Sequence, residues 1–138
     1  KMIISISQHR LLHVYAEIDQ EQCVAPSDGL LAIGRIVRDV KDVWTRSDGR
    51  VLIDSAGCLW VDYKVDGIPL KYLARDAGSF QRAAELNNAA SKLEFLPRSQ
   101  QWKYDEADQA FINWLRENDP QAIEDVGSYW NELRTTDF

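Results

Sequence analysis

The stretch CLWVDYKVDGIPLKYLA, residues 58–74, decides the fold of this chain. Apolar residues alternate with polar ones around the dipeptide Asp66-Gly67, and Asp-Gly between alternating runs is a strong signal for a β-hairpin. A further apolar run at residues 51–54 comes before it, separated by the turn-forming tripeptide Ser-Ala-Gly at residues 55–57. The sequence therefore predicts three antiparallel strands, over residues 51–54, 58–65 and 68–74.

The N-terminal residues predict a second hairpin. Ile4 and Ile6 alternate with serines over residues 2–7, and alternation returns over residues 12–18 after a polar turn at residues 8–10. A helix is the alternative for the second of these runs, because Leu11, Tyr15 and Ile18 also fit one helical face.

A helix is predicted between the two groups of strands. Its apolar residues recur at steps of three and four, which is typical of one helical face: Leu30, Ile33, Val37, Val40 and Trp44. Ser27 is suited to cap its start, and Ser47-Asp48-Gly49 to end it. The many Ile and Val residues make a strand the alternative, but the regular spacing favours the helix.

The remaining residues predict three more helices. The first begins at Ser79 and runs to about residue 93, where a polar stretch with Pro97 interrupts it. The second begins at Asp105 and turns Phe111, Trp114 and Leu115 to one side. The third follows the cap Asp119-Pro120 and carries a further apolar stripe of four residues: Ile123, Val126, Trp130 and Leu133.

Together these segments predict an α+β fold. Its mainly antiparallel sheet has about five strands, an N-terminal hairpin plus a central three-stranded meander, with one helix between them and a C-terminal group of three helices. A chain of 138 residues fits one domain, residues 1–138, in which residues 98–138 form a candidate helical subdomain docked on the rest.

Composition narrows the class of protein. With 45% hydrophobic and 28% charged residues the chain is typical of an ordinary globular domain. No apolar run reaches the roughly 20 residues of a membrane span, and the N-terminal residues do not have the pattern of a signal peptide. Two cysteines make no disulfide framework, so a reducing cytoplasm is the expected location. The acidic balance disfavours nucleic acid as the main partner.

Familiar catalytic and cofactor motifs are missing from the sequence, and we predict no catalytic residue, metal or cofactor. His9, His13 and Glu17 have metal-ligand spacing only if their segment is helical. Cys58 would be a nucleophile only beside a base, and a small buried thiol is the simpler interpretation. Arg35, Arg38 and Lys41 form a basic ridge on the predicted helix, for which a solvated face is favoured over a nucleic-acid site.

The most unusual feature is the charge of residues 101–138. Against three bases they hold nine acids, a net charge of −6 that equals the formal charge of the whole chain: Asp105, Glu106, Asp108, Glu117, Asp119, Glu124, Asp125, Glu132 and Asp137. Solvated helix faces and caps are the ordinary explanation for such a run. Acid concentrated in this way would also steer a basic partner towards these helices.

Trp60 is the candidate apolar anchor of such an interface. It shares a strand face with Cys58, Asp62 and Lys64, although a helix covering that face would make it part of the core. The leading hypothesis is a small protein-binding module whose acidic C-terminal helices bind a basic protein, with these partner-binding residues: Asp105, Glu106, Asp108, Glu117, Glu124, Asp125, Glu132 and Trp60. Inhibitors of nucleases, including bacterial toxin-immunity proteins, have this kind of size and charge, a comparison of composition only.

Two alternatives remain open at the level of sequence. One is a small-ligand-binding domain, or an enzyme without a familiar motif, in which aromatics line a pocket between sheet and helix: Tyr15, Trp60, Tyr63 and Tyr72. The other is a subunit of a homo-oligomer with Trp60 at the interface between copies.

Overall fold

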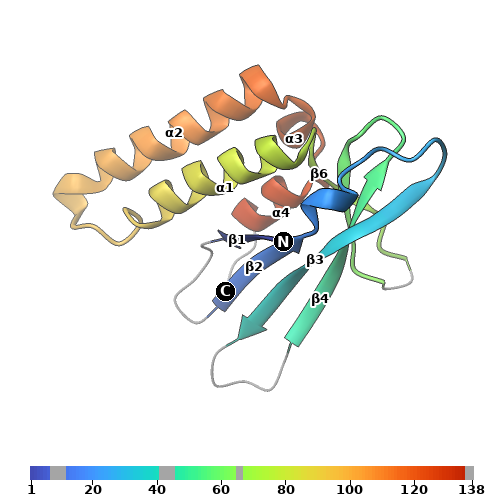
Figure 1. The fold of residues 1–138 in the computed structure, drawn as a ribbon. Helices are drawn as coiled ribbons and strands as arrows, with labels where there is room; N and C mark the ends of the chain where they lie inside the picture. Colours follow the sequence, from blue (N-terminus) through green and yellow to red (C-terminus); the bar gives the residue numbers. More distant parts are fainter. Residues whose placement is uncertain (7–11, 41–45, 65–66, 136–138) are drawn as a thin grey trace.

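The computed structural model describes residues 1–6, 12–40, 46–64 and 67–135. These residues form six strands followed by four helices (Figure 1). The strands are β1 (Met2–Ile6), β2 (Leu12–Ile18), β3 (Leu30–Val40), β4 (Arg46–Asp54), β5 (Leu59–Asp62) and β6 (Lys71–Ala74). The helices are α1 (Ala77–Ser91), α2 (Gln101–Asn118), α3 (Gln121–Glu124) and α4 (Tyr129–Thr135), and short 3-10 turns occupy Gln20–Gln22 and Arg98–Gln100.

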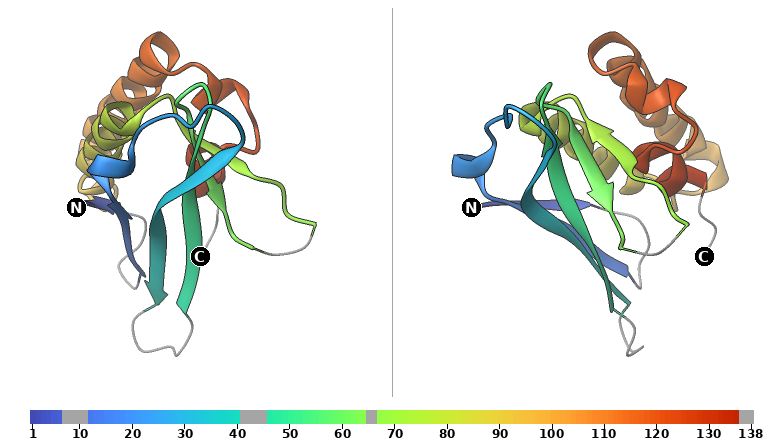
Figure 2. Two further views of the ribbon diagram at one scale, coloured as in Figure 1. Left: turned by 45° about the vertical axis from the view of Figure 1, so that its right-hand side comes forward. Right: turned by 90° about the vertical axis from the view of Figure 1, so that its right-hand side faces the viewer.

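All six strands belong to one curled antiparallel sheet, in which each strand pairs with the next along the chain (Figure 2). The N-terminal hairpin is confirmed, with Met2 opposite Ile18 and Ile6 opposite Val14. Ile4, Ile6, Val14 and Ala16 are buried on the face towards the helices, as their alternation predicts. The helical alternative for residues 12–18 is therefore excluded.

The helix predicted over residues 27–44 is wrong, because residues 30–40 form strand β3. Ile36 and Val37 are neighbours and both are buried, so the middle of β3 is covered on both faces and loses the alternation of a half-exposed strand. A bulge between Ala32 and Gly34 shifts the register again, and together the two effects imitate a helical spacing. The Ser-Asp-Gly stretch at residues 47–49 lies inside β4 and ends no helix, and Trp44 lies outside the described residues.

Gly34, beside the bulge, lets β3 lie very close to β2. A Cβ atom on this residue would come within 2.0 Å of the Glu17 carbonyl oxygen on β2, so only glycine lets the two backbones approach so closely.

The central hairpins are confirmed in pairing but not in length. β4 pairs with β5 across the turn at residues 55–57, and β5 pairs with β6. β5 ends at Asp62 and β6 begins at Lys71, so both strands are shorter than predicted, and Asp66 of the predicted turn lies outside the described residues. β4 also begins five residues earlier than predicted, at Arg46.

The helices gather on one side of the curled sheet (Figures 1 and 2). α1 packs against β1 and β6, while α2 packs on α1 and α3 and forms the outer layer. Trp130 of α4 packs among aromatic rings from the helices. Its ring centroid is 6.0 Å from that of Phe80, 5.4 Å from that of Phe111 and 5.3 Å from that of Tyr129. Its predicted place in the core is confirmed, since it is fully buried.

Two helix boundaries differ from the prediction. α2 begins at Gln101 rather than Asp105, because the 3-10 turn after Pro97 continues directly into the helix, so Trp102 is helical and not in a loop. The predicted third helix is two short ones, separated by a turn at residues 125–128. Val126, expected in the apolar stripe, lies in that turn and is 87% exposed.

The protein thus has an α+β fold, and its described residues form a six-stranded antiparallel sheet and four helices. Core residues come from both the sheet and the helices after residue 98, and a separate subdomain over residues 98–138 stays a prediction. None of the helices in the described part of the chain has the length and apolar character needed to cross a membrane.

Candidate partner-binding surface

The outer face of α2 presents an unbroken line of solvent-exposed side chains. Steps of four, three, four and four residues place them on one side of the helix: Trp102, Glu106, Gln109, Asn113 and Glu117. The Gln109 amide donates to the Asn113 side-chain oxygen at 2.9 Å, which links the middle of the line. Asp105 is exposed beside it. We call this line together with Asp105 the α2 outer face.

Four of the predicted binding acids remain available to a partner. Asp105, Glu106, Glu117 and Glu124 are all exposed. Within the described residues, none of the four carboxylates forms an ion pair or a side-chain hydrogen bond. Three of them lie on α2 and the fourth ends α3.

Two other acids are paired inside the molecule. Asp108 holds the guanidinium of Arg134 with both oxygens, one of them 3.0 Å from Nη2, and this hydrogen bonding raises the pKa of Arg134. Glu132 lies 2.5 Å from the ammonium of Lys71, which is mostly buried on β6. These pairs tie α4 to α2 and to the sheet.

Asp119 and Asp125 serve the backbone and a buried tyrosine. Asp119 is 3% exposed and accepts the Tyr72 hydroxyl at 2.5 Å and the Arg75 backbone N–H at 3.0 Å. The sequence predicted that Asp119 caps the next helix. In the structure Asp119 ends α2, and its side chain does not cap α3. Asp125 accepts the backbone N–H of Gly127 at 2.9 Å and so shapes the turn before α4.

The structure therefore divides the predicted binding acids into two groups. Asp108, Asp125 and Glu132 have internal roles, and their part in partner binding stays a prediction. The other four have no internal role among the described contacts. The sequence alone could not separate the groups, because Lys71 and Arg134 reach their acids only through the tertiary fold.

Trp60 is held within the protein. Its indole N–H donates to Asp54 at 2.9 Å, and its ring meets that of Tyr72 edge-on with centroids 5.4 Å apart. Burial alone would raise the pKa of Asp54, but the bonds from Trp60 and from the backbone N–H groups of Cys58 and Ala56 lower it overall. Trp60 is partly buried against the core, so a role as an anchor stays a prediction.

Trp102 is an exposed tryptophan that the sequence analysis did not select as an anchor. It is 54% exposed, and Phe95, in the loop before α2, is 60% exposed. The Gln101 side chain donates to the backbone carbonyls of Glu94 and Leu96, which holds that loop against the start of α2. The available signal was spacing: Trp102 precedes the buried Phe111 by nine residues, or two and a half helical turns, and so faces the opposite way.

The other candidate residues do not come together. Burial raises the pKa of the Cys58 thiol, the reverse of what activates a nucleophile. His9 and Lys41 lie outside the described residues, and no cluster of three metal-binding side chains occurs among those described. Arg35 and Arg38 lie on a strand, where their odd spacing places them on opposite faces, so the predicted basic ridge does not exist there.

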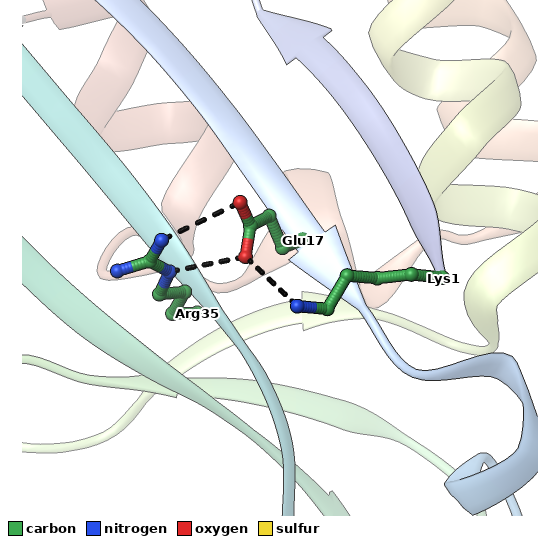
Figure 3. Close-up of polar contacts among 3 residues, drawn as sticks. All are labelled: Lys1, Glu17 and Arg35. Atoms are coloured by element: carbon green, nitrogen blue, oxygen red, sulfur yellow. Dashed lines mark hydrogen bonds and ion pairs between the residues drawn. The ribbon is translucent and has the colours of Figure 1, made fainter.

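Glu17 of β2 instead joins two cations on the outer face of the sheet (Figure 3). It accepts from Arg35 of β3 at 3.2 and 3.4 Å and lies 3.5 Å from the Lys1 ammonium. The hydrogen bond from Arg35 lowers the pKa of Glu17. These residues border a shallow hollow of about 370 Å³, but its charges already balance one another.

A larger cavity, of about 550 Å³, opens beside the start of α1. Small and apolar side chains line most of it, with Cys23, Arg75 and Asp76 as its polar members, and Arg75 is 3.6 Å from the Asp76 carboxylate. The four aromatics predicted to line a pocket border neither this cavity nor the hollow beside Glu17: Tyr15, Trp60, Tyr63 and Tyr72.

Comparison of the chain with protein-family models, curated proteins and solved structures finds no match. What this protein does must therefore be inferred from its own residues.

Proposed function

We propose that the protein is a small binding module that holds a basic protein partner against the α2 outer face and Glu124. One observation supports this proposal above the others. Asp105, Glu106, Glu117 and Glu124 are exposed acids without an ion pair in the described part of the chain, whereas acids close to them are paired internally. Unpaired exposed charge of one sign speeds encounter with an oppositely charged surface.

A cytoplasmic inhibitor of a basic enzyme, such as an immunity-type protein that blocks a nuclease, is the functional class that we infer. The size of the chain, its net charge of −6 and its two free cysteines support that inference. The partner would offer lysine and arginine side chains along a groove or strand. An acidic helix covering such a groove would compete directly with its anionic substrate.

The test compares two triple variants of equal charge change as baits for the host lysate. Asp105→Asn, Glu106→Gln and Glu117→Gln neutralise the α2 outer face, while Asp28→Asn, Glu21→Gln and Glu85→Gln neutralise exposed acids elsewhere. We expect the α2 variant to lose a basic protein that both the parent and the control retain. Equal capture by all three baits would refute the proposal.

The cavity beside α1 favours a second candidate, the binding of a small molecule. Its volume of about 550 Å³ falls in the usual range for ligand sites. A metabolite library screened by thermal shift would test it, with Gly78→Leu as the variant that fills the cavity. A ligand that stabilises the parent and not this variant would support the second candidate over the first.

A further inference from the structure

We infer that Trp102 is the anchor of the partner interface and that its ring receives a cationic side chain, arginine or lysine, from the partner. This inference rests on the proposed function and assigns the chemistry of one end of the α2 outer face. It places the anchor on the outermost helix rather than at Trp60.

The first support is the local arrangement around the ring. Asp105 and Glu106 follow Trp102 by three and four residues, so both carboxylates lie on the side of α2 that carries the ring. Both are exposed and form no ion pair within the described residues. A cation placed over the ring would therefore meet an aromatic face and two carboxylates together.

The second support is that the ring already has a cation over it. The ammonium of Lys103 lies 5.7 Å from the centre of the Trp102 ring, within the range of a cation–π contact. Lys103 is held there by its hydrogen bond to the Gln100 side chain at 3.3 Å. Lys103 occupies the position that we assign to the partner's cation. The partner's cation must therefore compete with Lys103 for the ring.

The competition gives a prediction with an unusual sign. Removing the positive charge of Lys103 should tighten binding of a cationic partner, although the change lies inside the interface. If Trp102 instead enters an apolar pocket of the partner, Trp102→Leu should also weaken binding, because the smaller side chain leaves the pocket partly empty, but Lys103→Gln should leave the affinity unchanged. The two modes of anchoring are therefore distinguishable.

The experiment is a nuclear magnetic resonance titration of the full chain with a peptide of alternating arginine and glycine, at about 50 mM salt to limit screening. A peptide with citrulline in place of arginine keeps the shape and removes the charge. The five indole N–H signals report each tryptophan, and Trp102→Leu identifies the one of interest. Affinity is measured for the parent, Trp102→Leu and Lys103→Gln.

We expect the arginine peptide to shift the Trp102 indole and the amides of Asp105 and Glu106, and the citrulline peptide to shift none of them. Trp102→Leu should weaken binding about threefold, and Lys103→Gln should tighten it about twofold. Shifts confined to Glu117 and Glu124 would overturn the inference and leave the proposed function standing. No binding, or equal affinity in all three proteins, would also overturn it, whereas the proposed function fails only if the bait comparison fails.

Discussion

The outer face of the sheet and the outer face of α2 are both charged and both solvent-facing, yet they treat charge differently. On the sheet, register places Glu17, Arg35, Arg50 and Asp62 in one row across four strands. Glu17 bonds to Arg35, and Asp62 accepts from Arg50 at 2.7 Å. On α2, Asp105, Glu106 and Glu117 find no such partner among the described residues.

The difference follows from what lies alongside each surface. A strand has neighbours on which an opposite charge can be placed in register, so a sheet can neutralise its own face. α2 forms the outer layer of the fold, and the side that carries Asp105, Glu106 and Glu117 faces away from the other helices, so no neighbouring element pairs with these acids among the described residues. Acids without an internal ion pair, such as those on the α2 outer face, are available to pair with the cations of a partner.

The largest expected effect concerns the pairing of β2 with β3, which places Glu17 opposite Arg35. Gly34→Ala would place a Cβ 2.0 Å from the Glu17 carbonyl oxygen, so β2 and β3 must separate where Glu17 meets Arg35. We expect a loss of about 3 kcal/mol in the free energy of unfolding, or no folded protein, measured by urea denaturation.

Gly78→Ala is the matched control for that substitution. The Cβ at residue 78 would meet only the Asp76 carboxylate, at 3.6 Å, in the first turn of α1. Alanine there should be neutral or stabilising by up to about 1 kcal/mol. Two glycine variants of equal stability would show that close approach of the strands is not what fixes the register.

The next effect separates an acid that the fold uses from one that it leaves free. Asp119→Ala would leave the buried Tyr72 hydroxyl and the Arg75 N–H without their acceptor, at a cost of about 2 to 3 kcal/mol. Glu117→Ala, two residues earlier and exposed, should stay within about 0.5 kcal/mol of the parent. Similar losses in both, by thermal or urea unfolding, would erase the distinction.

A smaller effect tests whether the row on the sheet is truly paired. The hydrogen bond from Arg35 lowers the pKa of Glu17 in the folded protein. The pair therefore stabilises the fold fully at a pH above the ordinary glutamate pKa of about 4.3. This stabilisation is lost as the pH falls through the lower pKa of the folded state. Arg35→Gln should raise the pKa of Glu17 towards its ordinary value, as read from carboxyl carbon shifts. Arg82→Gln, which breaks a pair on α1, should leave the pKa of Glu17 unchanged.

The smallest effect is on the α2 outer face itself. Asp105→Asn, Glu106→Gln and Glu117→Gln together remove three charges that make no described ion pair, so stability should change by less than about 0.5 kcal/mol. The expected change is instead a weaker dependence of stability on salt, because like-charge repulsion on the helix is reduced. A large destabilisation would mean that these acids have structural partners after all.

The sequence was enough to predict elements whose signal is local. The N-terminal hairpin follows from its alternation. Trp130 is buried as predicted, although the single helix predicted to carry its apolar stripe is two short helices. β3 was missed because burial on both faces and the bulge at Gly34 are tertiary properties that hide the period of a strand. Gly34 was the overlooked clue, since a glycine inside an apolar run often marks such a bulge.

The candidate surface was predicted in part, for a similar reason. The concentration of acids at the C-terminus can be counted from the sequence, but the partners of Asp108 and Glu132 depend on how α4 docks. Trp102 lies between Pro97 and Asp105, the predicted start of the helix, so the sequence prediction leaves it in a loop. Once the helix begins at Gln101, simple spacing places the ring on the outer face.

The order of the strands has a consequence for how the protein folds. Strands β1 to β6 lie side by side in the order of the chain, so every pairing in the sheet closes a short loop and costs little chain entropy. The ties between layers span far more chain: Asn88 reaches the Ser5 carbonyl across 83 residues, and Asp119 reaches Tyr72 across 47. We expect the hairpins to form before the helical layer docks, so that loss of Asp119 accelerates unfolding and leaves the folding rate almost unchanged.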